Sequence, residues 1–346
     1  MKNLIAKIFT RRLFTKNRRV MSLMCAFVLG ASIFVGCGNA NNAGIAAANT
    51  DGISVVTTIF PEYDWVRQIV GDSANVDITM LLDNGVDLHS YQPNAEDIMK
   101  ISTCDVFIYV GGESDEWVDD ALKEATNKDM VVVDLLDVLG DSVKEEEVVE
   151  GMEAEEEEEE AEGGEEEVEY DEHVWLSLKN TQTLVTAISD ALGTVDAENA
   201  SVYAENAAKY NEELAALDAQ YQDAVDAANV NTILFGDRFP FRYLTDDYGL
   251  DYYAAFVGCS AESEASFETI TFLAGKVDEL GLNSVLTIEN SDQKIAETII
   301  VNTNSKDAKI LTLDSMQSTT SADVEAGATY LGIMENNLSV LKEALQ

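Results

Sequence analysis

The chain has 346 residues, with 65 acidic and 21 basic side chains, two histidines and a formal net charge of −44 at pH 7. Such a charge repels nucleic acid and anionic lipid and concentrates cations near the protein surface. The composition therefore excludes nucleic-acid binding. It fits a cationic partner but does not prove one.

The N-terminus has the pattern of a targeting segment. Residues 1–19 carry seven basic side chains and no acid, and an apolar run from Val20 to Val35 follows. This run is short for a membrane span and has the basic flank of a secretory signal. It ends in Phe34-Val-Gly-Cys37, which resembles a bacterial lipobox.

On that resemblance, residues 1–36 are a lipoprotein signal peptide, Cys37 becomes the lipidated first residue, and residues 37–52 are a flexible tether. The alternatives are a plain signal peptide or a membrane anchor, and in each case the protein works outside the cytoplasm. Residues 1–36 hold seven of the 21 basic residues and no acid, so the remaining chain has a net charge of −51 rather than −44.

Residues 53–178 are predicted to form a first α/β lobe, because β-branched apolar runs alternate with helical patterns. Such alternation is typical of a parallel sheet. The predicted strands are 53–60, 76–82, 105–110 and 130–135, and the predicted helices are 62–71 and 94–102.

An acidic segment interrupts this order at residues 145–169, where 16 of 25 residues are Glu. Like-charge repulsion and low apolar content predict a solvated, disordered loop. The segment is either a solubilising insert or a low-affinity collector of cations beside a site.

Residues 179–228 contain no Pro and have a helical pattern, which predicts a rod linking two lobes. A second α/β lobe follows at residues 229–346. Its predicted strands are 232–235, 252–256, 284–288 and 309–313, and its predicted helices are 242–248, 266–280, 293–303 and one from about residue 322. We therefore expect an α/β fold of two similar lobes joined by a long rigid helix, with a ligand site in the crevice between them.

Both histidines lie beside acidic residues in predicted loops. His89 follows the second strand, His173 follows the acidic segment, Asp237 follows strand 232–235, and Glu289 and Asp292 follow strand 284–288. Loops of this kind face the crevice between two α/β lobes. Two imidazoles with one or two carboxylates suit zinc or manganese, and more carboxylate favours the harder ion.

Two cysteines remain after the N-terminal segment. Cys104 lies in a strand-like run, which favours a buried, small apolar role. A disulfide between Cys104 and Cys259 is compatible with export, but the sequence does not establish it.

Five strings carry a family resemblance. They are Val56-Thr-Thr-Ile-Phe-Pro61-Glu-Tyr-Asp, Met80-Leu-Leu, Gly85-Val-Asp-Leu-His89-Ser-Tyr-Gln-Pro93, Asp105-Val-Phe-Ile-Tyr and Asp171-Glu-His173-Val-Trp-Leu. Together they resemble the metal-specific solute-binding lipoproteins of bacterial ABC importers, the zinc/manganese group, over roughly residues 53–346. The family's two metal-binding histidines fall on His89 and His173.

The chain departs from the family's pattern at the remaining ligands. Zinc members supply a third histidine in a Phe-His-Asp string, where this chain has Phe235-Gly-Asp237. Asp237 is therefore a candidate oxygen ligand, unless it pairs with Arg238. Asp292, with Glu289 as the alternate, lies where manganese members place a carboxylate, unless it caps a helix.

The manganese members' other carboxylate would fall near Gly258-Cys259. On the resemblance, Cys259 and Glu262 also remain open as ligands.

The resemblance implies a lipid-anchored, monomeric extracytoplasmic receptor that captures Zn²⁺, or alternatively Mn²⁺, and passes it to an ABC permease without catalysis. One alternative is a zinc-dependent extracellular hydrolase. It would need an open coordination position and a general base, but the chain has no His-Glu-x-x-His string. Another is a surface adhesin with a structural metal.

Overall fold

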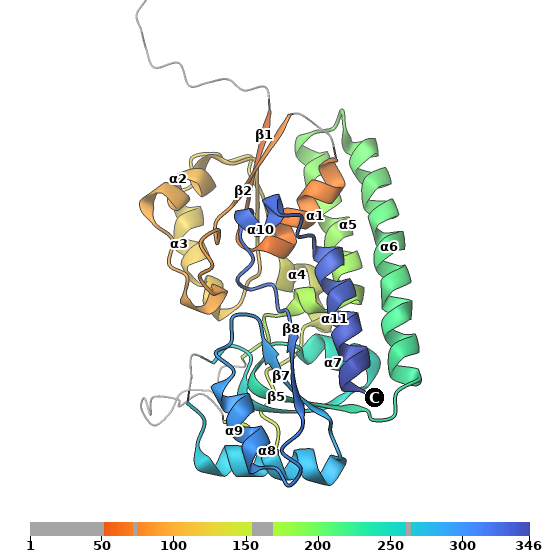
Figure 1. Ribbon diagram of the computed structural model, residues 1–346. Helices are drawn as coiled ribbons and strands as arrows, with labels where there is room; N and C mark the ends of the chain where they lie inside the picture. The colour runs from red at the N-terminus through yellow and green to blue at the C-terminus, as the bar shows by residue number, and fades with distance from the viewer. Residues whose placement is uncertain (1–51, 72–74, 154–168, 261–263) are drawn as a thin grey trace, which may run out of the picture. The chain divides into compact units, whose positions relative to one another are not determined.

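The computed structural model describes residues 52–71, 75–153, 169–260 and 264–346 (Figure 1). All of them belong to one compact unit. The predicted signal peptide, Cys37, residues 154–168 of the acidic segment and Glu262 lie outside the described residues. Within those ranges, none of the helices has both the length and the apolar content of a membrane span.

The first lobe is built on a four-stranded parallel sheet in the order β2-β1-β3-β4. The strands lie where the sequence predicts them but are shorter. They are β1 (Ile53–Thr57), β2 (Val76–Met80), β3 (Val106–Tyr109) and β4 (Val131–Asp134), with helices α1 (Phe60–Val70), α2 (Ala95–Thr103), α3 (Trp117–Lys123) and α4 (Leu135–Leu139). Pro61 lies in the first turn of α1, where a missing N–H costs nothing. Glu62 accepts a hydrogen bond from the backbone N–H of Thr58 at 2.8 Å.

The second lobe repeats this arrangement, with a parallel sheet in the order β6-β5-β7-β8. Its elements are β5 (Thr232–Phe239), α7 (Arg242–Tyr248), β6 (Asp251–Val257), α8 (Phe267–Leu280), β7 (Ser284–Ile288), α9 (Lys294–Asn302), β8 (Lys309–Leu313) and α10 (Ser321–Glu325). β5 continues past the predicted end at Phe235 through an irregularity before Arg238. Gly236 permits this path, because a Cβ there would lie 2.6 Å from the Cα of Ala296 in α9.

The predicted rod at 179–228 is two helices, α5 (Leu178–Val195) and α6 (Ala200–Asp226). The turn between them is held by Asp196, whose carboxylate accepts from the Asn199 side chain and the Tyr203 hydroxyl at 2.7 Å each. α5 packs on the first lobe, whereas α6 contacts α1 of the first lobe and α7 of the second.

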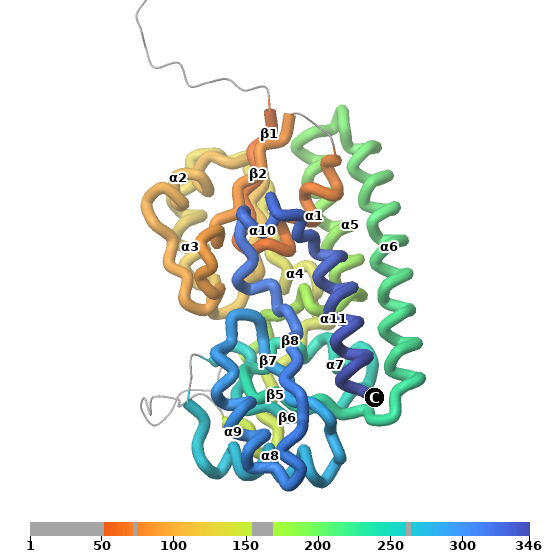
Figure 2. Tube along the Cα trace, in the orientation of Figure 1, coloured from red at the N-terminus to blue at the C-terminus, as the bar shows by residue number. Residues whose placement is uncertain are grey.

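A helix of 27 residues is about 40 Å long, so α6 can span both lobes. The C-terminal helix α11 (Tyr330–Ala344) lies alongside it, and the Tyr221 hydroxyl of α6 donates to the Met334 carbonyl at 2.7 Å (Figure 2). The expected architecture of two similar α/β lobes joined by a long helix is confirmed.

Candidate metal centre

His89 lies in a short 3₁₀ turn, Leu88–Ser90, in the loop that follows β2. Asp87 begins this turn, and its Oδ1 accepts a hydrogen bond from the His89 backbone N–H at 3.2 Å. The Nδ1 atom of His89 lies 2.8 Å from the Ser114 hydroxyl and 3.5 Å from Oε2 of Glu172. These contacts engage one ring nitrogen and orient the imidazole.

His173 is fully buried at the end of the chain segment that returns from the acidic region. Asp171 holds it twice, because its Oδ1 accepts from the His173 backbone N–H at 2.9 Å and lies 3.0 Å from Nδ1. The Tyr243 hydroxyl of α7 donates to the Asp171 carbonyl at 2.8 Å and so secures this segment to the second lobe. A carboxylate on Nδ1 places the proton there and leaves the Nε2 lone pair for a metal.

The two rings converge on one point. Their Nε2 atoms are 3.2 Å apart, and the ring planes are tilted by 55°. In a tetrahedral zinc site with Zn–N distances of about 2.0–2.1 Å, two nitrogen ligands are about 3.3 Å apart. The spacing of His89 and His173 therefore fits two ligands of one zinc ion.

Cys259 completes a group of three. Its sulfur and the two imidazoles offer ligand atoms that all lie within 4.8 Å of one another. Cys259 follows β6 of the second lobe, so the group includes donors from both lobes. The preceding Gly258 leaves room for the ring, because a Cβ there would lie 2.8 Å from Cε1 of His173.

Gln317, a buried residue in the loop after β8, also reaches this group. With its carboxamide oriented to satisfy its neighbours, the nitrogen donates to both oxygens of Asp87, at 3.1 and 3.2 Å. The carboxamide oxygen then lies 3.3 Å from Nε2 of His173, which again matches the spacing of two ligands in one shell.

The electrostatics around the rings favour a cation. Burial and the neighbouring His173 lower the pKa of His89 to about 3, so this imidazole is neutral at physiological pH. Burial alone would lower the pKa of His173, but Asp171, Glu172 and Asp87 more than offset it and the net pKa is raised. The same carboxylates that favour a proton on His173 would stabilise a metal cation between the rings.

The structure does not bring the predicted carboxylates into this group. Asp237 lies within β5, where its carboxylate accepts from the backbone N–H groups of Arg238 at 2.9 Å and Ile288 at 3.4 Å. Glu289 accepts from the backbone N–H and hydroxyl of Ser315 at 2.6 and 2.8 Å. The carboxylates of Asp237 and Glu289 therefore already have donors.

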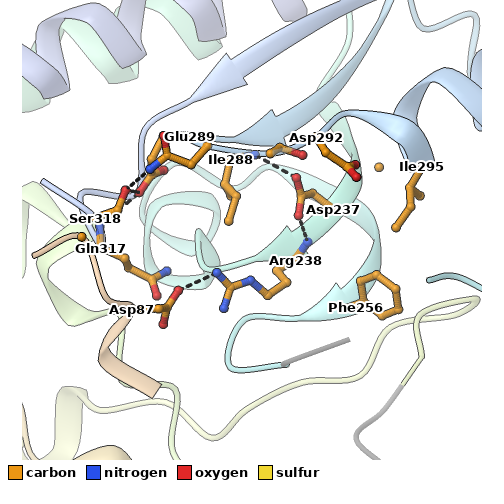
Figure 3. A pocket seen from close by; sticks show the side chains of 14 residues that line it. Asp87, Asp237, Arg238, Phe256, Ile288, Glu289, Asp292, Ile295, Gln317 and Ser318 are labelled. Carbon is orange, nitrogen blue, oxygen red and sulfur yellow. Dashed lines mark hydrogen bonds and ion pairs between the residues drawn. The ribbon is translucent and has the colours of Figure 1, made fainter. Parts of the chain in front are cut away.

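Asp292 is exposed, accepts from the Lys294 backbone N–H at 3.0 Å, and pairs with the Lys294 ammonium group. Asp237, Glu289 and Asp292 line a cavity of about 280 Å³ (Figure 3). Asp87 and Gln317, which contact the two histidines, line the same cavity. The alternative for Asp237 was a pairing with Arg238, and it holds only for the Arg238 backbone N–H. The guanidinium of Arg238 pairs instead with Asp87, at 2.6 Å.

A second cavity, of about 360 Å³, opens from the histidine group itself. Its lining includes His89, Cys259, Glu172, Glu146 and Glu169. The two ends of the acidic segment meet at this cavity, since the backbone N–H of Glu146 donates to the Glu169 carbonyl at 2.9 Å. The glutamate-rich segment therefore begins and ends beside the site.

Sequence reasoning left Cys259 open and missed Gln317. Both lie in loops that follow strands of the second lobe, and this position was the feature of the sequence that could have identified them as candidates. Cys104 is buried in the first lobe, where its thiol donates to the Ile101 carbonyl at 3.2 Å, and it forms no disulfide with Cys259.

Residues 55–344 match the ZnuA family, described as zinc-uptake complex component A, periplasmic. The chain belongs to this family. It is 32% identical to the zinc-binding lipoprotein AdcA of Streptococcus pneumoniae serotype 4 over 327 residues, which cover 94% of this chain and 60% of that protein. It thus spans only about three fifths of that relative's length. It is also 29% identical to the high-affinity zinc uptake system protein ZnuA of Bacillus subtilis, covering 96% and 99% of the two chains.

Solved structures share the fold. The Zn(II)-bound ZnuA-like domain of S. pneumoniae AdcA superimposes with a TM-score of 0.65 at 28% identity, covering 85% of this chain and 99% of that one. The metal-dependent lipoprotein YcdH of B. subtilis gives a TM-score of 0.67 at 26% identity, covering 85% and 100%. These similarities confirm the family resemblance and the two-lobed architecture.

Proposed function

We propose that this protein captures Zn²⁺ outside the cytoplasm and delivers it to the permease of an ABC importer. The observation that carries the proposal is the 3.2 Å spacing of the two Nε2 atoms, with Cys259 in the same group. Family membership and the zinc-binding relatives support it. His89, His173 and Cys259 are the proposed protein ligands, and the Gln317 carboxamide oxygen is the fourth donor.

The donor set favours zinc over manganese. Two imidazoles and a thiolate are borderline to soft ligands, which suit Zn²⁺, whereas Mn²⁺ prefers carboxylate, carbonyl and water oxygens. The predicted carboxylate ligands Asp237, Asp292 and Glu289 would have made the site harder. In this proposal their own donors keep them outside the coordination shell.

The same donor set favours a receptor over a hydrolase. A catalytic zinc keeps one position open for water or substrate, whereas here four protein donors would fill the tetrahedron. Ligands drawn from two lobes also suit capture and release, because separating the lobes would dismantle the site. The ion itself undergoes no reaction.

The remaining parts of the chain have roles in the same proposal. Cys37 carries the lipid anchor, residues 37–52 form the tether, and the receptor acts as a monomer. The acidic segment 145–169 raises the local concentration of cations at the cavity where its two ends meet.

Replacement of His89 tests the proposal. His89→Ala removes one proposed ligand from a partly exposed position between the lobes, so the fold should persist while zinc affinity falls by at least two orders of magnitude, or about 3 kcal/mol. Competition titration against a fluorescent zinc chelator measures the affinity, and circular dichroism checks the fold. A folded His89→Ala variant with the affinity of the wild type would refute the assigned site.

A further inference from the structure

Asp87 connects the proposed zinc ligands to the opposite lobe. Its Oδ1 accepts from the backbone N–H of His89 at 3.2 Å, so it sets the position of the first ligand. Two side chains of the second lobe grip the same carboxylate. Arg238 donates to Oδ2 at 2.6 Å, and the Gln317 carboxamide donates to both oxygens.

Arg238 extends this connection to the third ligand. Its second guanidinium nitrogen donates to the Ser260 carbonyl, next to Cys259, at 3.4 Å. Its backbone is held in turn by Asp237, which is fixed to β7 through Ile288 (Figure 3). One side chain therefore links the loop that carries His89 with the loop that carries Cys259.

Arg238 is well placed to keep the lobes together. It lines both the 280 Å³ cavity and the 360 Å³ cavity and so stands between them. Its side chain is 19% exposed, and that of Asp87 is 26% exposed. At this level of burial, solvent screens the attraction between the two charges only partly. The planar guanidinium of Arg238 also matches the geometry of a carboxylate better than a lysine ammonium group would.

We infer that Arg238 is a positioning residue that clasps Asp87 across the lobes and thereby sets how fast zinc leaves the site. The inference rests on the proposed zinc-binding function. Arg238 supplies no ligand atom to the metal, so replacing its side chain would leave the coordinating atoms in place. The lobes would separate more readily, and separation precedes release because His89 and Cys259 belong to different lobes.

The test compares dissociation with association. Stopped-flow mixing of the zinc-loaded full-length protein with excess chelator gives the dissociation rate, and mixing of the metal-free protein with zinc gives the association rate. Removing one partner of a hydrogen-bonded, partly buried charge pair acts mainly on dissociation. We expect Arg238→Gln to release zinc about tenfold faster, with association changed by less than about twofold.

Four further variants make the test specific. Asp87→Asn retains an oxygen for the His89 N–H but loses the ion pair and one of the two oxygens that accept from Gln317, so it should release zinc at least as fast as Arg238→Gln, and the double variant should be no faster than Asp87→Asn alone. Arg238→Lys should restore part of the slow release. Arg242→Gln is the matched control, because Arg242 is similarly exposed but pairs with Glu147 and Asp246 instead.

Substitution with Co²⁺ separates the two proposals. An unchanged thiolate-to-cobalt absorption band in Arg238→Gln would show that the ligands are intact and that the variant acts through position. A folded Arg238→Gln variant that releases zinc at the wild-type rate would overturn the proposed role of the Arg238–Asp87 pair but not the zinc site. Additive effects on the release rate in the double variant would do the same. Failure of the wild-type protein to bind zinc would overturn the proposed function itself.

Discussion

Gly258 offers the sharpest perturbation of the proposed site that spares every ligand. A Cβ at this position would lie 2.8 Å from Cε1 of His173, 3.1 Å from its Nδ1 and 3.0 Å from the Phe239 carbonyl oxygen. Carbon atoms in contact are about 3.5–4.0 Å apart. The substitution Gly258→Ala must therefore displace the imidazole or the strand end by about 0.7–1.2 Å.

This displacement is large for a metal site, whose ligand distances are defined to about 0.2 Å. It would also disturb the 3.0 Å contact between Nδ1 of His173 and Asp171. Loss of such an orienting partner typically costs 10–100-fold in metal affinity, or about 1.4–2.7 kcal/mol. We expect Gly258→Ala to weaken zinc binding by that factor.

The assay is a competition titration of zinc between the protein and a fluorescent chelator. Gly275→Ala is the control, because Gly275 lies inside α8 and a Cβ there meets no atom within 4 Å. The control should bind zinc normally and gain about 0.5–1 kcal/mol in its free energy of unfolding. A folded Gly258→Ala variant with wild-type zinc affinity would contradict the placement of His173 and of the adjoining strand end, which carries Cys259, in the coordination shell.

Three other outcomes follow from the structure. Cys259→Ser should abolish the thiolate-to-cobalt absorption band and weaken zinc binding at least tenfold; a retained band would remove Cys259 from the ligand set. Burial raises the pKa of Asp115 from 3.8 to about 7 despite hydrogen bonds from Gly111 and Val110. The folded protein therefore holds this proton more tightly than the unfolded chain, and the contribution to stability is lost as the pH rises from about 4 to about 7. In urea unfolding of the metal-free protein, the free energy of unfolding of Asp115→Asn minus that of the wild type should therefore rise by up to about 4 kcal/mol from pH 4 to pH 8. A difference that does not change with pH would contradict this. Replacing residues 154–168, with their ten glutamates, by a neutral linker should slow zinc association at low salt and leave equilibrium affinity within about twofold; an equal loss of tight binding would make the segment part of the site.

Strand positions were predictable because parallel strands buried on both faces are β-branched, apolar runs. The helices α3 and α4 were not, since seven and five residues are too few to show a period on their own, although the equally short α7 was predicted at 242–248. The turn between α5 and α6 was missed for another reason. It contains neither Pro nor Gly, and it depends on Asp196 bonding to side chains three and seven residues further on.

The meeting of His89 and His173 was predictable, because both lie in loops that face the same crevice between the lobes. The carboxylates were not, because a sequence does not show which donors will occupy them. Asp237 and Glu289 lie at the expected edge of the sheet, but backbone N–H groups take their oxygens. Cys259 follows β6 and Gln317 follows β8, so each comes close to the rings only because of how these strands are placed in the second sheet.

X-ray absorption spectroscopy at the zinc edge, on stoichiometrically loaded protein, tests the central claim most directly. The proposed site predicts four ligands: two imidazole nitrogens at about 2.0–2.1 Å, one sulfur at about 2.3 Å and one oxygen. A shell without sulfur, or one with a single imidazole, would contradict the assignment of His89, His173 and Cys259 to one ion.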